Sequence, residues 1–132
     1  MNSDIVQSYY KNPLKNYEMV DATVSAHQGN SLCGDDITVF LQVDDGVIQD
    51  YSFIGNCSMI TTAAASFLSE IIIGISVDEV LTRNYETMSS QGFEVSPRRK
   101  RAAVIAILAV RNALHQLIGD GKVDDFDDLI AE

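Results

Sequence analysis

The fold is decided by residues 37–54, ITVFLQVDDGVIQDYSFI, which predict two strands joined by a tight turn. Every second residue from 37 to 43 is Ile, Val, Leu or Val, and this period of two is typical of a half-buried strand. Asp45-Gly46 favours a two-residue hairpin turn, because both central positions of such a turn need positive φ. The stretch from Val47 to Ile54 is therefore expected to pair back as an antiparallel strand.

A helical period follows the hairpin. Apolar residues recur three and four positions apart, at Ile60, Ala63, Ala64, Phe67, Leu68, Ile71 and Ile72. This pattern predicts an amphipathic helix from about Cys57 to just before Gly74, whose alanines let it lie close to the sheet. A second long helix is expected from Pro97 to Ile118, and it should be largely buried because residues 102–110 are all apolar.

Four weaker patterns complete the chain: helices at Ser3–Tyr10, Val77–Arg83 and Asp124–Ala131, and a strand at Glu18–His27 followed by a loop at 28–31. Strands then helices, without a repeat or a low-complexity linker, predict a single α+β domain over residues 1–132. We expect a small three-stranded antiparallel sheet packed on one side by helices.

Composition restricts the function. The 132 residues are 46% hydrophobic and 21% charged, as in an ordinary globular domain. The net charge of −10 argues against nucleic acid as a partner, because phosphate binding needs a basic surface. The start of the chain shows no secretory signal, and the longest apolar run has nine residues where a membrane span needs ~20. A cytoplasmic protein that does not contact a membrane is expected.

Charge is unevenly distributed along the chain. Four of the nine basic residues form the run Arg98-Arg99-Lys100-Arg101. Acidic residues crowd the end instead, at Asp120, Asp124, Asp125, Asp127, Asp128 and Glu132. This layout suits a protein partner with a charged patch, and it equally suits solvated helix ends. His115 is expected on the surface.

Two cysteines frame the hairpin. Cys33 and Asp35 flank Gly34 before the first hairpin strand, and Cys57 follows the second strand. A hairpin returns the chain near its origin, so both thiols can face one pocket at the same edge of the sheet. The N-terminus of the following helix is expected to favour the thiolate form of Cys57. Alternatively, Cys57 is a small buried hydrophobe, Cys33 a loop thiol and Asp35 a turn former.

Three stretches resemble a known family: YYKNPLKN at 9–16, CGDDITVFLQVDDGVIQDYSFIG at 33–55 and TTAAASFLSE at 61–70. From about Tyr9 to Leu117 the chain is similar to the IscU/SufU/NifU N-terminal iron–sulfur cluster assembly scaffolds. The resemblance implies a non-enzymatic scaffold that builds a cluster on three cysteines and the aspartate of Cys-Gly-Asp. It also implies partners: a cysteine desulfurase as sulfur donor, a chaperone and acceptor apoproteins.

The chain departs from that family at two ligand positions. Cys33 and Asp35 match the first cysteine and the aspartate. Ser58 falls on the second cysteine when counted from the alanines, with Cys57 one residue early, so the occupant of that position stays open. Arg101 and Ala102 replace the histidine and the third cysteine.

The expected metal ligands are therefore Cys33, Asp35 and Cys57. A fourth ligand would have to come from Ser58, His27, water, a partner chain or an external thiol, since iron and zinc usually take four. A methyl group binds no metal, and the guanidinium of Arg101 repels a cation. An iron–sulfur cluster, iron or zinc should bind weakly or not at all.

Two functions follow from this ligand set. The first is a scaffold-like protein of iron–sulfur cluster assembly with weakened iron or cluster binding, monomeric or weakly dimeric. The second is a metal-free paralogue that acts as an interaction module for a desulfurase or chaperone, with Pro97–Arg101 as the candidate docking stretch. A hydrolase or transferase is disfavoured, because the sequence has no phosphate loop and no Ser–His–Asp pattern.

Overall fold

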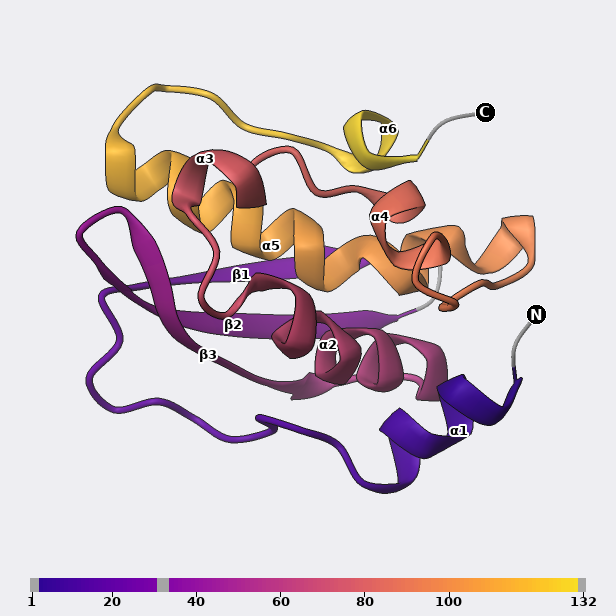
Figure 1. Cartoon of the computed structure of the whole chain (residues 1–132). Coiled ribbons are helices and arrows are strands. Elements are labelled where there is room, and N and C mark those ends of the chain that lie inside the picture. The colour runs from indigo at the N-terminus through magenta and orange to yellow at the C-terminus, as the bar shows by residue number, and fades with distance from the viewer. Residues whose placement is uncertain (1–2, 31–33, 131–132) are drawn as a thin grey trace.

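The computed structural model describes residues 3–30 and 34–130, and Figure 1 shows a three-stranded sheet with helices on one face. Strands β1 (Val24–Asn30), β2 (Asp35–Asp44) and β3 (Val47–Asn56) pair antiparallel in the order β1-β2-β3. The predicted α+β class and sheet are confirmed.

The β2–β3 hairpin forms as its sequence predicts. Asp45 and Gly46 turn the chain with φ of 52° and 72°, which a two-residue turn requires. Ile37, Val39 and Leu41 are each 0% exposed, so the alternate residues of β2 face the core. The register shifts once, between Gln42 and Val43.

The first strand differs from its prediction at both ends. Gln28 and Gly29, expected in a loop, pair with Ile37 and Asp36, whereas residues 18–23 lie outside the strand. The chain before β1 lies at the other side of the sheet instead, where the amide of Phe53 on β3 donates to the carbonyl oxygen of Lys15 at 2.9 Å. This contact places the segment around Lys15 against β3, the edge strand opposite β1.

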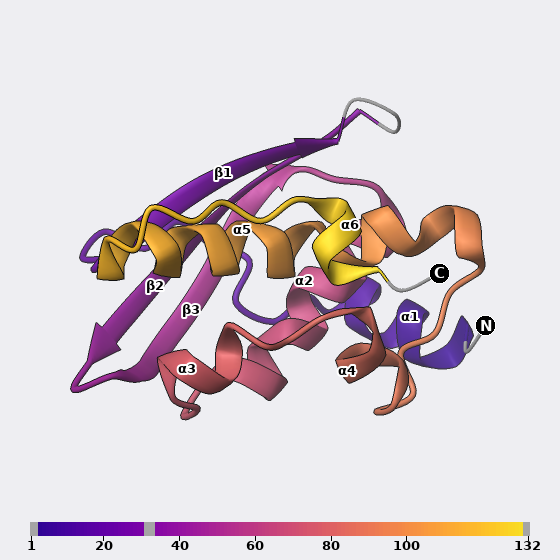
Figure 2. The same cartoon turned by 90° about the horizontal axis from the view of Figure 1, so that it is seen from above.

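Three helices build the layer that covers the sheet (Figure 2). Helix α5 (Lys100–Ile118), which follows a 3₁₀ turn at Pro97–Arg99, packs on β1 and β2. Helix α2 (Met59–Ile72) lies beside α5, and α1 (Ser3–Lys11) packs on α2. Predicted helix bounds are close to those observed.

Three short helices complete the fold: α3 (Val77–Val80), α4 (Tyr85–Ser89) and α6 (Phe126–Leu129). Helices α4 and α6 contact α5, whereas α3 lies by the hairpin turn, where the Val77 amide donates to the carbonyl oxygen of Gly46 (Figure 2). Helices α3 and α6 are shorter than predicted, and Ala131 lies outside the described residues. Helix α4 was not predicted. A capping box between Asn84 and Thr87 holds its single turn, which buries only Met88 and so leaves no helical period in the sequence.

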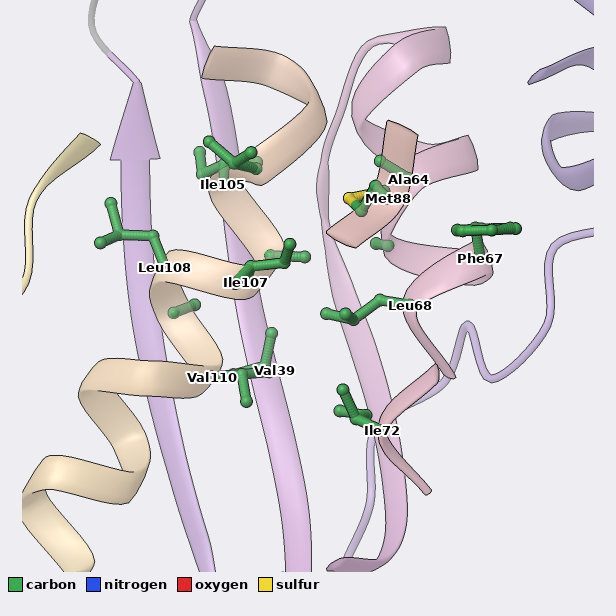
Figure 3. Packing of buried hydrophobic residues seen from close by; sticks show 14 of the residues in the cluster. Val39, Ala64, Phe67, Leu68, Ile72, Met88, Ile105, Ile107, Leu108 and Val110 are labelled. Carbon is green, nitrogen blue, oxygen red and sulfur yellow. The ribbon is translucent and has the colours of Figure 1, made fainter. Parts of the chain in front are cut away.

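The core lies between α5, α2 and the sheet. Residues 102–110 of α5 are all at most 6% exposed, and Figure 3 shows Ile107 and Leu68 in the cluster that joins the two helices with Val39 of β2. Residues Pro97–Ile118 are apolar and long enough to cross a membrane, yet 67% of their most apolar window is buried inside the protein. This helix serves as the centre of the core.

Candidate metal site

The candidate site lies at the end of the sheet where β2 begins and β3 ends. Asp36 of β2 pairs with Asn56 of β3, and this pairing brings Cys57 back beside the start of β2. The thiol of Cys57 donates to the carbonyl oxygen of Asp36 at 3.5 Å. Cys33 lies outside the described residues, so the predicted meeting of the two sulfurs remains a prediction. Asp35 and Cys57 both lie at this end of the sheet.

Asp35 is a buried carboxylate, 4% exposed, held by the start of α2. One of its oxygens accepts from the backbone amide of Ser58 at 2.7 Å, and the other accepts from the hydroxyl of Thr61, also at 2.7 Å. The Ser58 hydroxyl lies 3.4 Å from that second oxygen. Because free donors at a helix N-terminus favour a negative charge, Asp35 ties β2 to α2. Both of its oxygens are therefore in use before any metal arrives.

Ser58, one of the two candidates for the second ligand position, is the N-cap of α2. Its side chain accepts from the amide of Thr61 at 3.4 Å, and its backbone is extended, as an N-cap requires. The thiol of Cys57 precedes this cap, next to two carboxylates. Of these two side chains, Cys57 carries the softer metal ligand.

The predicted activation of Cys57 is wrong. The pKa of its thiol is raised to about 11, first because the half-buried sulfur loses solvent and then because the charges of Asp35 and Asp36 oppose a thiolate. The end of α2 does not offset this rise, and two amides there are already taken: that of Ser58 by Asp35 and that of Thr61 by the Ser58 hydroxyl. Cys57 is a protonated thiol at neutral pH, and a cation is needed to draw off its proton.

Replacing Asp35 by alanine should lower the free energy of unfolding by about 2 kcal/mol, because the Ser58 amide and the Thr61 hydroxyl lose their acceptor. Urea unfolding at neutral pH measures the loss. Asp36→Ala is the matched control: its side chain is 58% exposed and pairs with His27 in solvent, so a change within about 0.5 kcal/mol is expected. An Asp35→Ala protein as stable as the wild type would show that this carboxylate is a free ligand and not a helix anchor.

The remaining candidates do not complete a ligand shell. Ala102 is 6% exposed, and the guanidinium carbon of Arg101 lies 4.8 Å from the ring centre of Phe126. His27 is exposed and paired with Asp36. His115, expected on the surface, is 7% exposed because Asp120 and Asp124 cover its ring, which corrects that prediction.

The donor set of the described residues does not fit a tightly held metal. Across residues 3–30 and 34–130, no three His, Cys, Asp or Glu side chains are grouped so that they hold an ion. Asp35 and Cys57 offer an occupied carboxylate and a protonated thiol. A metal bound here would need further ligands from outside these two side chains.

Comparison with known proteins identifies the family of the chain. Residues 1–122 match the family model described as the NifU-like N terminal domain. The chain belongs to this family. The prediction made from the residues at 9–16, 33–55 and 61–70 is thereby confirmed.

Several relatives of this NifU-like domain are named as iron–sulfur cluster assembly scaffold proteins. It is 38% identical over 82 residues to the "Iron-sulfur cluster assembly scaffold protein IscU" of Thermotoga maritima, a match covering 62% of this chain and 58% of the relative. It is 25% identical over 130 residues to "Iron-sulfur cluster assembly scaffold protein IscU 1" of Archaeoglobus fulgidus, covering 98% and 85%. A 27% match over 78 residues to the "Zinc-dependent sulfurtransferase SufU" of Bacillus subtilis covers 59% and 52%.

Solved structures share the fold of this NifU-like domain. A putative SUF-system scaffold from Fervidobacterium islandicum superposes with a TM-score of 0.71 at 22% identity, covering 84% of this chain and 94% of that one. The N-terminal part of a NifU-like protein from Brucella abortus gives 0.72 at 18% identity, covering 89% and 94%. These likenesses establish the architecture.

Proposed function

We propose that this protein is a scaffold-type component of iron–sulfur cluster assembly that binds iron or a cluster weakly as cargo. Family membership and the named scaffold relatives support the process. The observation that carries the weak binding is the alanine at 102, where the resemblance expects a third cysteine. Cys33, Asp35 and Cys57 then supply at most three ligands.

The proposed binding depends on exchange of partners around Asp35. A metal that takes a carboxylate oxygen of Asp35 must share that oxygen with the Ser58 amide or the Thr61 hydroxyl, each 2.7 Å away, or displace that donor. It must also replace the proton on Cys57, which costs less once a cation offsets the two neighbouring carboxylates. Both costs reduce affinity and speed release, which suits transfer to an acceptor.

The expected partners follow from the proposed process. A cysteine desulfurase would supply sulfur, and an acceptor apoprotein or a chaperone would take part in release. We place this exchange in the cytoplasm and expect a monomer or weak homodimer that catalyses no reaction of its own. The relative named as a zinc-dependent sulfurtransferase makes sulfur transfer from Cys57 or Cys33 the enzymatic counter-proposal.

A second candidate function is a metal-free interaction module for a desulfurase or chaperone. The engaged oxygens of Asp35 and the protonated thiol of Cys57 favour it. So does the basic turn that precedes α5, where Arg98 is exposed and Arg99 is partly exposed. This function needs neither cysteine.

Anaerobic reconstitution with iron and sulfide separates the two functions. The first predicts a weak visible chromophore that a desalting column largely removes and that the Cys33→Ser, Cys57→Ser double variant does not form. The second predicts no chromophore in either protein, with binding to a desulfurase retained by the double variant. A stable chromophore that survives loss of both thiols would contradict this assignment of ligands.

A further inference from the structure

Residues 120–130 fold back along the outside of α5 and are called the strap. Gly119 ends α5 in the left-handed conformation, with φ of 68°, and reverses the chain. Figures 1 and 2 show the strap returning beside α5 to place α6 near the start of that helix. The acidic end of the sequence is thus bound to the molecule instead of extending into solvent.

Asp124 fixes the middle of the strap to three side chains of α5. Its carboxylate accepts from Nε of Arg111 at 2.9 Å and faces Nε2 of His115 at 2.9 Å through the same oxygen. Its backbone bonds the amide side chain of Asn112 in both directions, at 2.7 and 3.1 Å. Arg111 is itself held by the carbonyl oxygen of Arg83 at 2.9 Å.

His115 joins this cluster to the beginning of the strap. Its Nδ1 faces a carboxylate oxygen of Asp120 at 2.8 Å, while Nε2 faces Asp124. The pKa of Asp120 lies below its usual range, chiefly because the Lys122 amide donates to it and also because of His115, so this group stays ionised. An ionised carboxylate only accepts hydrogen bonds, so both contacts form only when both ring nitrogens carry a proton.

The far end of the strap covers the start of α5. The ring of Phe126 lies under Arg101, and Leu129 is 1% exposed. Arg101 is the direct neighbour of Ala102, the position of the missing third ligand. The strap therefore borders the part of α5 that the proposed function uses.

We propose that the strap is a proton-dependent latch over the start of α5, closed while His115 is an imidazolium ion and loosened when the ring loses a proton. The biological use of this latch rests on the proposed function, whereas its opening and closing depend only on the contacts of His115. The charged groups that face the ring are Asp120 and Asp124 from the strap, with Arg111 of α5 and Lys122 of the strap adjoining them.

Loss of one proton has a defined structural effect. A neutral ring donates through one nitrogen only, so the other nitrogen turns its lone pair toward a carboxylate in a partly buried contact. Arg111 and Asn112 still hold Asp124, which makes the Asp120 contact the weaker one. The strap should then open more often while α5 and the sheet stay folded.

Hydrogen exchange read by mass spectrometry tests the latch without any metal. Protection of residues 119–130, corrected for the intrinsic exchange rate at each pH, should fall about tenfold between about pH 6 and pH 9. Protection of β2 in the same samples should not change, which separates strap opening from unfolding. His27→Gln is the matched control, because the chain has two histidines and His27 lies on β1 away from the strap.

His115→Gln should remove the pH step, leaving the strap equally weakly protected at both pH values. Asp120→Asn, which keeps every contact of Asp124, should make the step smaller, because an amide can pair with either form of the ring. A strap whose protection is independent of pH in the wild type, or a full step that survives in either variant, would overturn the latch. Failure of cluster reconstitution would not affect this result, so the two proposals fail separately.

Discussion

A Gly55→Ala variant should lose about 4 kcal/mol or more of its free energy of unfolding. A methyl group at this position would lie 2.0 Å from the carbonyl oxygen of Asp36 and 2.8 Å from Cα of Ile37. Both atoms belong to the backbone of the paired strand β2, so no side-chain rotation relieves the overlap. Gly55 also has φ of 157°, which side chains rarely adopt.

The same close approach forms the candidate site. Gly55 lets the end of β3 lie against the carbonyl oxygen of Asp36, to which the thiol of Cys57 then donates. If the variant folds, the strands must separate there, and Cys57 moves away from Asp35 and Asp36. We therefore expect the pKa of the Cys57 thiol to fall from about 11 toward its ordinary value in any folded fraction.

Gly46→Ala provides the matched control for this loss. Gly46 has φ of 72° in the hairpin turn, but nothing lies within 4 Å of the added methyl group. Gly46→Ala should therefore lower the free energy of unfolding only through backbone strain, by about 1–2 kcal/mol. Urea unfolding followed by circular dichroism compares the variants, and equal losses for Gly55→Ala and Gly46→Ala would show that β3 does not approach β2 as closely as the structure places it.

Local sequence patterns predict most of the fold because a few residues specify each element. The alternation of Ile37, Val39 and Leu41 fixes which face of β2 is buried, and Asp45-Gly46 fixes the turn. The long apolar run of α5 predicts a buried helix. Strand β1 is less predictable, because Gln28, Gly29 and Asn30 at its end are polar or lack a side chain and join the strand only by pairing with β2.

The candidate site is predicted less completely, because its properties come from contacts distant in sequence. The Cys-Gly-Asp pattern singles out Asp35, but the bonds of Asp35 to Ser58 and Thr61 appear only once α2 is placed against β2. The thiol of Cys57 looks activated when α2 alone is considered. Only the structure shows that the sulfur is half-buried and lies beside two carboxylates, and burial first and then these charges raise its pKa.

His115 illustrates the same limit. Nothing on its own helix explains its burial, since the groups that cover it, Asp120 and Asp124, follow a reversal at Gly119. Taken alone, the acidic residues from Asp120 onward predict a segment that is exposed to solvent. The sequence held one indication of this contact. Arg111 and His115 are four residues apart, on one face of α5, and acidic residues that can pair with them follow at 120 and 124.

The Ala102→Cys variant should bind zinc about 100-fold more tightly than the wild type, a gain of about 2.7 kcal/mol. A thiolate is among the ligands that zinc prefers, and it would add to Cys33, Asp35 and Cys57 the ligand that the chain lacks. Ala102 is 6% exposed, so the added sulfur lies at the edge of the core and reaches the site only if the start of α5 borders it.

Ala103→Cys is the control for an added thiol. Ala103 is the next residue on α5 and is 1% exposed, but successive side chains of a helix point about 100° apart, so its sulfur should face elsewhere. Circular dichroism of both variants establishes that the fold is kept. Ala103→Cys should bind zinc no more tightly than the wild type.

Zinc dissociation constants for the wild type, Ala102→Cys and Ala103→Cys, measured side by side without oxygen against a chromophoric chelator, test the incomplete ligand set most directly. We predict weak binding by the wild type and by Ala103→Cys, and a gain of about 100-fold for Ala102→Cys alone. Tight binding by the wild type that Ala102→Cys does not improve would contradict the account, because the shell would then already be complete without residue 102.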